Sequence, residues 1–461
     1  MNLTPVDFDP FKDLDKIIPT SEPQREILGS VKFGNDAANC AYNESLTLKL
    51  TGPFVYDAIV KAANAVVARH GSLRATFIEE GVKMRIADNT TIDVPLIDIS
   101  NIATAEQQAH LNEIITEDVS APFDLPNGPL FDVKVIKLAA QLHYVIITAH
   151  HIVCDGWSMG IVMQDLSAFY NQHVTGQPAV LQPAIQFDDY VADEIAFEAS
   201  TAYETTAQYW LNLYKDYNQV FELPTDKPRP ALRSYNAKRI DCPLPNDVIT
   251  QIKKAGAQLG CSLVNTLIAA YEVFLFKLTK QPNIILGLPS AGQSVTDNYS
   301  LVGHCVNLLP LKTRVDGNTS FSDYLVARKK TLFDAFENQR YTFGTLIKKL
   351  NVPRDPSRIP LVPVAFNADL GLADGVAFEK LQLELFSNPR NYENFEIFFN
   401  ISGQQNNLAI ECTFNTDLYD NDLMHNRLHE FVFVLEQLAA DMKTKINNVQ
   451  LTPINEVEII K

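Results

Sequence analysis

The chain has 461 residues, of which 46% are hydrophobic and 20% are charged, a composition typical of a globular protein with sizeable cores. At about 150 residues per domain, this length predicts two or three domains or two large lobes. The formal net charge is −17, from 38 basic and 55 acidic side chains. Such an acidic balance argues against general affinity for nucleic acid, because phosphates are bound mainly by Lys and Arg.

The six cysteines are scattered and form no Cys-x-x-Cys pair, so the sequence favours free thiols over a zinc site or a disulfide framework. The first residues, MNLTPVDFDPFKD, are polar and acidic, unlike the basic start and apolar core of a signal peptide. No apolar run approaches the ~20 residues needed to span a bilayer. We therefore expect a cytoplasmic protein that contacts no membrane.

Residues 1–180 alternate helices with strands, the pattern of an α/β layered lobe. Thr20 or Ser21 is expected to cap a helix that Pro23 begins. Gly71 is expected to end a second helix in the left-handed conformation. The remaining elements predicted here are a strand over 45–50, a helix over 54–69, strands over 73–77 and 82–86, a helix over 103–119, a strand pair over 131–137 and 142–149, and a helix over 158–173.

Residues 223–230 form the clearest linker, because their three prolines exclude a helix interior or a central strand. A helical region over 186–220 precedes this linker. The elements predicted after it are a strand over 238–242, a helix over 245–259 that Gly260 stops, a helix over 263–278, strands over 283–288 and 306–315, a helix over 321–339, an extended segment over 364–367, a hairpin over 395–401 and 408–415, and a helix over 423–442. The α/β pattern therefore occurs twice, and two similar lobes would leave a cleft suited to a ligand.

The turn HHIVCDG at residues 150–156 joins a strand to a helix and is the main candidate for chemistry. Adjacent side chains on an extended strand point to opposite faces, so only one of His150 and His151 can face a given cavity. Residue types alone leave a catalytic imidazole and a structural, hydrogen-bonded histidine both open. A metal site is disfavoured, because adjacent histidines reach one ion only with distortion and zinc sites usually add further nearby ligands.

Other short motifs do not support a different chemistry. The stretch GLPSAG at residues 287–292 differs from the Gly-x-Ser-x-Gly nucleophile elbow, because Pro289 disturbs the placing of its first glycine. The chain contains neither a Gly-x-x-x-x-Gly-Lys phosphate loop nor a Gly-x-Gly-x-x-Gly turn. ATP and NAD are therefore unsupported as direct substrates.

A series of motifs follows one order along the chain and covers about residues 17–450. Residues 150–156 match HHxxxDG, residues 354–361 match RDxSRxPL, and residues 69–77 match RHxxLRTxF apart from Ala75. Weaker likenesses lie at residues 20–28, where Leu28 replaces an aromatic residue, and at residues 187–190, 302–307 and 338–343. The series resembles that of the condensation domains of nonribosomal peptide synthetases, which share HHxxxDG with chloramphenicol acetyltransferase-like acyltransferases.

The resemblance implies an α/β fold of the layered α+β type. Two chloramphenicol acetyltransferase-like lobes would form a V-shaped pseudo-dimer with a tunnel between them. Residues 1–180 would form the N-terminal lobe that carries HHxxxDG. Residues 181–461 would form the C-terminal lobe, which begins with a helical connection and the Pro-rich linker over 181–235.

The same resemblance assigns the site residues. His151 is the active imidazole and is grouped with Gly156 and His150 as catalytic candidates. His151 would take a proton from an attacking amine or position that amine, His150 would pack inward, and backbone N–H groups around Gly156 would meet an oxyanion. Family members pair the motif's aspartate with the arginine of RHxxLR, which implies a structural pair of Asp155 with Arg74. The candidates for lining the substrate tunnel are Trp157, Ser158, Asn307 and Ser290.

The implied reaction forms an amide bond by aminolysis of a thioester. An acceptor aminoacyl group would attack a donor acyl or peptidyl thioester, both carried on phosphopantetheine arms. The sequence after Asp155 resembles that of domains with an L-configured donor and an L-configured acceptor, and the intact HHxxxDG excludes the paired aspartates of heterocyclisation relatives. We expect no cofactor or metal bound directly.

The implied partners are an upstream donor carrier protein, a downstream acceptor carrier protein and an adjacent adenylation domain, with the chain itself monomeric. Residues 451–456 resemble the linker into such an adenylation domain, so we expect the chain to come from a larger synthetase. Two alternatives stay open. One is a free-standing acyltransferase that makes an ester or amide from a coenzyme A or carrier thioester. The other is a non-catalytic recruitment domain, against which the intact HHxxxDG argues.

Overall fold

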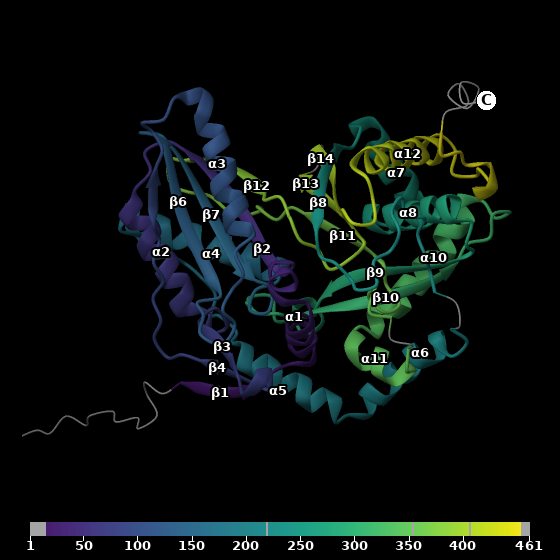
Figure 1. The fold of residues 1–461 in the computed structure, drawn as a ribbon, viewed down its shortest axis with the longest axis horizontal. Coiled ribbons are helices and arrows are strands. Elements are labelled where there is room, and N and C mark those ends of the chain that lie inside the picture. The colour runs from purple at the N-terminus through teal and green to yellow at the C-terminus, as the bar shows by residue number, and fades with distance from the viewer. Residues whose placement is uncertain (1–14, 218–219, 353–354, 405–406, 453–461) are drawn as a thin grey trace, which may run out of the picture.

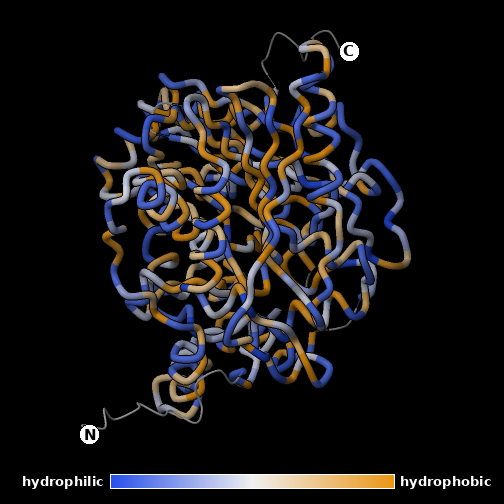
Figure 2. The backbone as a smooth tube through the Cα atoms, turned by 90° about the vertical axis from the view of Figure 1, so that its left-hand side faces the viewer, coloured by the Kyte–Doolittle hydropathy of each residue, from blue (hydrophilic) through white to orange (hydrophobic). Residues whose placement is uncertain are grey.

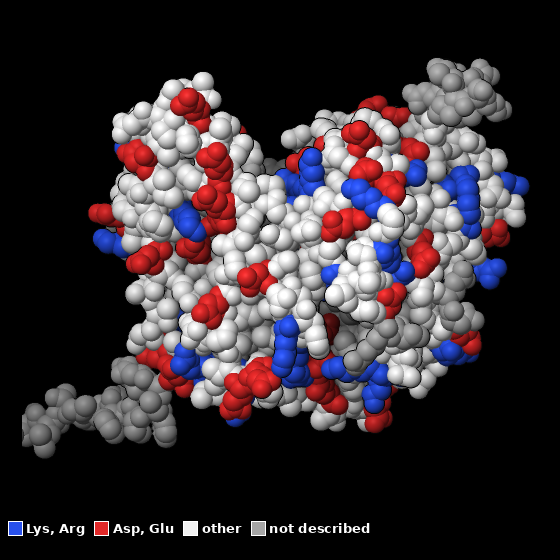
Figure 3. Space-filling view, viewed as in Figure 1, with Lys and Arg blue, Asp and Glu red and all other residues white. Residues whose placement is uncertain are grey.

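The computed structural model describes residues 15–217, 220–352, 355–404 and 407–452. The chain forms two lobes that diverge as a V, and the space-filling view shows a hollow between their upper ends (Figure 1; Figure 3). This mixed α/β arrangement confirms the predicted fold class. The predictions for MNLTPVDFDPFKD, for Arg354 and for residues 453–456 lie outside the described residues.

The N-terminal lobe is built on a five-stranded sheet with the order β12-β2-β7-β6-β5. Its strands are β2 (Asn43–Thr51), β5 (Leu96–Asp98), β6 (Phe131–Ala139), β7 (Leu142–His150) and β12 (Gln382–Ser387). The hairpin of β6 and β7 follows the predicted one. Antiparallel pairing of β7 with β2 sets His150 opposite Asn43. The double-histidine turn therefore begins beside the first residues of β2.

Helices cover both faces of this sheet (Figure 1). The helices α2 (Tyr56–Arg69) and α4 (Gly156–Thr175) share a core with Val135 and Val145. The helix α3 (Thr104–Val119) packs on the opposite side against Ile136 and Ile146. Strands covered on both faces have nearly continuous apolar runs, which explains the sequence of β7. Hydrophobic stretches accordingly run through the middle of the lobe (Figure 2).

A smaller sheet of order β1-β4-β3 flanks the N-terminal lobe. It contains β1 (Lys16–Pro19), β3 (Ala75–Ile78) and β4 (Lys83–Ile86), and α1 (Glu22–Cys40) follows β1. The predicted cap of α1 is confirmed, because Ser21 and Gln24 form a reciprocal capping box. The prediction for Gly71 is wrong: α2 ends at an extended His70, and Gly71 begins a 3₁₀ turn instead.

The C-terminal lobe contains a six-stranded sheet of order β10-β9-β11-β13-β14-β8. Its strands are β8 (Ala237–Pro243), β9 (Asn283–Ala291), β10 (Val306–Arg314), β11 (Val364–Leu370), β13 (Ile397–Gln404) and β14 (Asn407–Asn415). Its larger helices are α7 (Asn246–Gln258), α8 (Leu263–Thr279), α10 (Phe321–Glu337) and α12 (Asn421–Ala440). The ring of Tyr271 stacks on that of Phe399, and Phe431 meets both rings edge to face, which joins α8, the sheet and α12 in one core. Gly260 ends the α7 segment with a positive φ, as predicted.

Connecting helices join the lobes and complete the C-terminal one. They are α5 (Phe187–Glu198), α6 (Thr201–Tyr214), the short α9 (Gly292–Val295) and α11 (Phe343–Leu350). The Pro-rich linker is irregular between Leu223 and Pro230, as expected. In the described part of the chain, no single helix is long and apolar enough to cross a membrane, and the pair α7 and α8 passes that test only jointly, bent by 104°.

The two halves of the chain exchange segments, which corrects the predicted division at residue 180. The strand β12 lies late in the sequence but pairs along its length with β2 of the N-terminal sheet. Four further residues from the second half are buried in the N-terminal core: Leu301, Val302, Cys305 and Phe378. Residues 181–461 are therefore not one separate lobe.

Candidate active site

The turn that carries the two histidines is held by backbone hydrogen bonds on both sides. The N–H of His151 donates to the Tyr42 carbonyl at 2.7 Å, and the N–H of Val153 donates to the His150 carbonyl at 3.0 Å. Asp155 then caps α4 by accepting from the Ser158 N–H at 2.8 Å. A carboxylate at this position also interacts favourably with the helix dipole. The side chains of the turn are thus fixed between two rigid elements.

His150 is an interior residue with no exposed surface. Its Nδ1 accepts from the Ile152 N–H at 3.2 Å, and its ring lies near those of Tyr42 and Phe123. Burial, followed by the neighbouring His151, lowers the pKa of His150 to about 3, so this ring stays neutral. The structure contradicts a direct catalytic part for His150 and fits its predicted packing role.

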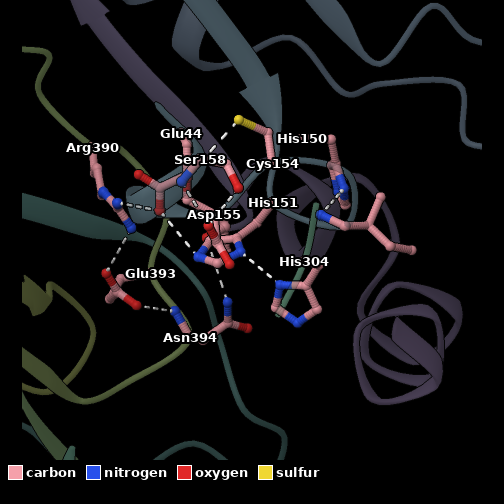
Figure 4. Close-up of polar contacts among 12 residues, drawn as sticks. Glu44, His150, His151, Cys154, Asp155, Ser158, His304, Arg390, Glu393 and Asn394 are labelled. Carbon is pink, nitrogen blue, oxygen red and sulfur yellow. Dashed lines mark hydrogen bonds and ion pairs between the residues drawn. The ribbon is translucent and has the colours of Figure 1, made fainter. Parts of the chain in front are cut away.

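His151 lies at the seam between the lobes, and about a fifth of its side chain is exposed (20%). Its Nδ1 is 3.0 Å from Nδ1 of His304, and its Nε2 is 3.5 Å from Oε1 of Glu44 (Figure 4). Glu44 belongs to β2, whereas His304 lies in the loop before β10. The ring that HHxxxDG singles out is therefore contacted from both halves of the chain.

Glu44 is a carboxylate with a fixed cation beside it. Its Oε1 accepts from Nη2 of Arg390 at 2.7 Å. Arg390 lies in the segment that directly follows β12. Burial alone would raise the pKa of Glu44, but Arg390 and His151 outweigh burial and lower it. Because β12 pairs with β2, the strand exchange itself brings Arg390 to the site.

His304 is a buried, neutral imidazole. It is 6% exposed, and burial, followed by His151 and His150, lowers its pKa well below the usual value. Neither His304 nor Glu44 nor Arg390 was among the predicted site residues. His304 does stand within the VGHCVN stretch that resembles (V/I)GxFVN, whereas Glu44 and Arg390 carry no local motif.

The predicted pair of Asp155 with Arg74 is wrong. Arg74 donates to the carbonyls of Val67, Ala68 and Ala87, so it caps the end of α2. A guanidinium satisfied by three carbonyls needs no carboxylate, and Arg74 is absent from the partners of Asp155 among the described residues. The expected brace of the turn must therefore come from other groups.

Asp155 is fully buried and braced by neutral donors. Its Oδ1 accepts from the N–H and hydroxyl of Ser158 at 2.8 and 2.7 Å, and its Oδ2 accepts from the Cys305 N–H at 2.9 Å. The amide of Gln293 donates to both oxygens at 3.0 Å. Cys305 and Gln293 come from the second half of the chain, so this carboxylate joins segments that lie far apart in the sequence.

The four tunnel candidates have different positions. Ser158 is fully buried, and its hydroxyl donates to Asp155 and accepts from the Gly303 N–H, which contradicts a lining role. Trp157 is 40% exposed and donates to the Tyr299 carbonyl. Ser290 and Asn307 line a common pocket, and His151 is not one of the residues that line it. Both side chains form hydrogen bonds with Gln339. A tunnel-lining role for Trp157, Ser290 and Asn307 stays a prediction.

Gly156 begins α4, but its backbone does not require glycine. It is not among the residues with a positive φ, so an L-residue could adopt the same conformation. A Cβ at this position would meet no heavy atom within 4 Å. The absence of a side chain therefore keeps space open beside the turn. Among the described residues, no three His, Cys, Asp or Glu side chains gather to hold a metal ion.

Two layered lobes with an HHxxxDG turn at their seam are the arrangement that the series of motifs predicts for a condensation domain. The family model of the condensation domain matches residues 15–460, so the chain belongs to this family. Domains of this family are found in nonribosomal peptide synthetases.

The chain resembles individual proteins along almost all of its length. Gramicidin S synthase 2 of Brevibacillus brevis is 29% identical over 446 residues, which are 96% of this chain and 10% of that protein. The first condensation domain of the CDA synthetase has a TM-score of 0.83 at 20% identity, covering 95% of this chain and 99% of that one. The X-domain from teicoplanin biosynthesis has a TM-score of 0.81 at 20% identity, covering 94% and 97%. The chain thus spans about a tenth of that curated relative, and the structural likenesses establish the fold.

Proposed function

We propose that this chain is a catalytic condensation domain that joins a donor acyl or peptidyl thioester to an acceptor aminoacyl thioester. Both substrates would be carried on phosphopantetheine arms of carrier proteins, and both would have the L configuration. The observation that supports this proposal best is the position of His151. It is the partly exposed imidazole of an intact HHxxxDG turn, with polar partners from both halves of the chain.

The reaction needs an uncharged amine, a held thioester and stabilisation of the tetrahedral intermediate. His151 would take a proton from the acceptor nitrogen, and general base catalysis of this kind contributes about 10²–10⁴-fold. The first N–H groups of a helix have no partner within the helix. Those of Gly156 and Trp157 would therefore be donors for the oxyanion, and the bare Gly156 leaves room for the substrate beside them.

The proposed partners follow from the substrates. An upstream carrier would deliver the donor, a downstream carrier would deliver the acceptor, and an adenylation domain would follow in a larger cytoplasmic synthetase. Tethering raises the effective concentration of both groups at the seam. The prosthetic arms would belong to the carriers, so the domain itself would bind no cofactor.

A panel of aminoacyl carriers tests the proposal. Donor and acceptor carriers loaded with defined L-amino acids are mixed with the chain, and the dipeptidyl carrier is detected by intact mass. The same donors are offered in parallel as coenzyme A thioesters. Product from carrier-bound pairs alone supports condensation, whereas turnover of free coenzyme A thioesters supports the free-standing acyltransferase. Absence of product with every pair supports a recruitment domain, which the shared fold with the X-domain makes worth testing.

A further inference from the structure

His151 has one neighbour on each ring nitrogen, and neither neighbour belongs to HHxxxDG. His304 faces its Nδ1 and Glu44 faces its Nε2, so the ring lies between an imidazole and a carboxylate (Figure 4). The proposed reaction uses only His151 and backbone groups. The two neighbours therefore call for an account of their own.

His304 restricts where the proton of His151 sits. A neutral imidazole has one donor nitrogen and one acceptor nitrogen. Two Nδ1 atoms at 3.0 Å need one proton between them, which either ring can supply. If His304 donates, the proton of His151 moves to Nε2, and His151 keeps no free lone pair for a substrate. If His151 donates, His304 accepts and Nε2 is left as a base.

Glu44 makes the Nε2 side attractive to a cation. Arg390 engages Oε1 of Glu44 at 2.7 Å, and within the described part of the chain Oε2 has no hydrogen-bond partner. The side chains of Glu44 and His151 are each 20% exposed, whereas His304 is buried. The exposed surface of the group therefore belongs to Glu44 and His151, whose facing atoms are Oε1 and Nε2. Two acceptors converging on one accessible point suit an N–H donor with positive charge.

We propose that Glu44 and His304 are positioning residues that prepare His151 for the ammonium group of the acceptor. This inference rests on the proposed function. His304 accepts the proton on Nδ1 of His151, which leaves the lone pair on Nε2. The acceptor's ammonium group lies between Nε2 and the Glu44 carboxylate.

The proton balance of this arrangement is complete. One proton passes from the ammonium nitrogen to Nε2, and the resulting imidazolium is stabilised by Glu44. The neutral amine attacks the thioester carbonyl, so that the C–N bond forms and the C–S bond breaks. A second nitrogen proton ends on the sulfur, and His151 returns its proton to solvent. The products are the amide, the thiol and one proton.

Substitution of Glu44 tests the carboxylate. Glu44→Gln is expected to lower kcat/KM for the acceptor about 10- to 100-fold, the range for one hydrogen bond to a charged group. The KM of the donor is expected to stay unchanged. The acidic limb of the pH–rate profile is expected to change, because Glu44→Gln removes the negative charge that lies 3.5 Å from Nε2 of His151. Glu44→Asp keeps the charge beside Arg390, and it is the variant to measure if Glu44→Gln fails to fold.

Other titrating groups near the pair need a control. His150, Arg390 and Asp369 surround Glu44 and His151, and burial followed by Glu44 raises the pKa of Asp369 to about 6. Asp369→Asn removes that titration. If the acidic limb disappears in Asp369→Asn and is unmoved in Glu44→Gln, the assignment to Glu44 is overturned.

A matched pair of variants tests His304. His304→Leu removes the acceptor for Nδ1, and it is expected to lower kcat about 10-fold. His304→Asn sets an amide oxygen near the former Nδ1, and it is expected to restore most of that loss. If His304 had only a structural role, both variants would lose activity in proportion to their loss of thermal stability.

Nitrogen NMR of labelled histidine gives a readout that needs no turnover. Wild-type protein is expected to show His151 with its proton on Nδ1, and His304→Leu is expected to lose that preference. A resting protein with the proton on Nε2 overturns the inference even if amide product forms. Absence of amide product with the expected tautomer present overturns the proposed function alone.

Discussion

Asp155 and His151 lie four residues apart in one turn, yet their surroundings differ in kind. Asp155 is fully buried, and neutral donors from both halves of the chain occupy its two oxygens. His151 is partly exposed, and its neighbours are groups that can carry charge. The difference shows that one short motif contains both a residue that stabilises the turn and a residue that is available to react. Asp155 fixes the turn, and His151 has the freedom to change its proton.

Removing the imidazole is expected to have the largest effect on activity. His151→Ala should reduce condensation about 10²–10⁴-fold, the range for general acid–base catalysis. Its thermal unfolding should match wild type, because the side chain fills no core. A His151→Ala variant that retains the wild-type rate would contradict the catalytic role of His151.

Removing the carboxylate is expected to affect stability most. Asp155→Ala leaves the buried N–H groups of Ser158, Cys305 and Gln293 without an acceptor, at a cost of about 1–3 kcal/mol in the free energy of unfolding for each group that stays unsatisfied. Urea denaturation measures this cost. Asp155→Asn keeps one acceptor oxygen and serves as the control, with a smaller loss. Equal stability of Asp155→Ala and wild type would contradict the holding role.

The pH dependence of stability tests the charged surroundings of His151 through Asp369, a carboxyl group near Glu44. Burial, followed by the charge of Glu44, raises the pKa of Asp369 from 3.8 to about 6. The folded state then binds this proton more tightly than the unfolded chain, so its contribution to stability is full below about pH 3.8 and is lost as the pH rises through about 6. Asp369→Asn should therefore be about 2–3 kcal/mol more stable than wild type near pH 7 and little changed below about pH 4.

The smallest effect on activity is expected for Arg74→Ala, which tests the predicted pair of Arg74 with Asp155. Arg74→Ala removes the donors that cap the end of α2 and is expected to cost about 1–3 kcal/mol in urea denaturation. The condensation rate of the folded protein should be unchanged, because Asp155 has other partners. A rate loss as large as that of His151→Ala would restore the predicted pair of Arg74 with Asp155.

Local patterns predicted most of the fold. The capping box at Ser21, the continuous apolar run of β7 and the stop at Gly260 each depend on neighbours in sequence, so the sequence contains their cause. The strand β12 was missed because it is a short edge strand with mostly exposed side chains. Its partner β2 lies more than 300 positions earlier, and no local pattern indicates such a pairing.

The sequence predicted the site residues that belong to HHxxxDG but not their partners outside the motif. HHxxxDG located His151, but the partners of that ring come from β2 and from the loop before β10. Glu44 has the sequence context of an ordinary strand residue. The error over Arg74 has a physical cause too, since Arg74 and Asp155 each have enough local partners without the other. Long-range contacts of this kind follow from the fold.

The exchanged strand limits how the molecule can be divided or opened. Residues 1–180 on their own would expose the edge of β2 that β12 normally occupies, and an unpaired edge is a template for aggregation. Because β12 is joined at both ends to the other lobe, any widening of the V must bend its flanking segments or detach the strand. Arg390 follows directly after β12, so such a movement would also shift the cation beside Glu44. Opening of the lobes would thereby change the distance between the cation and the carboxylate at the site.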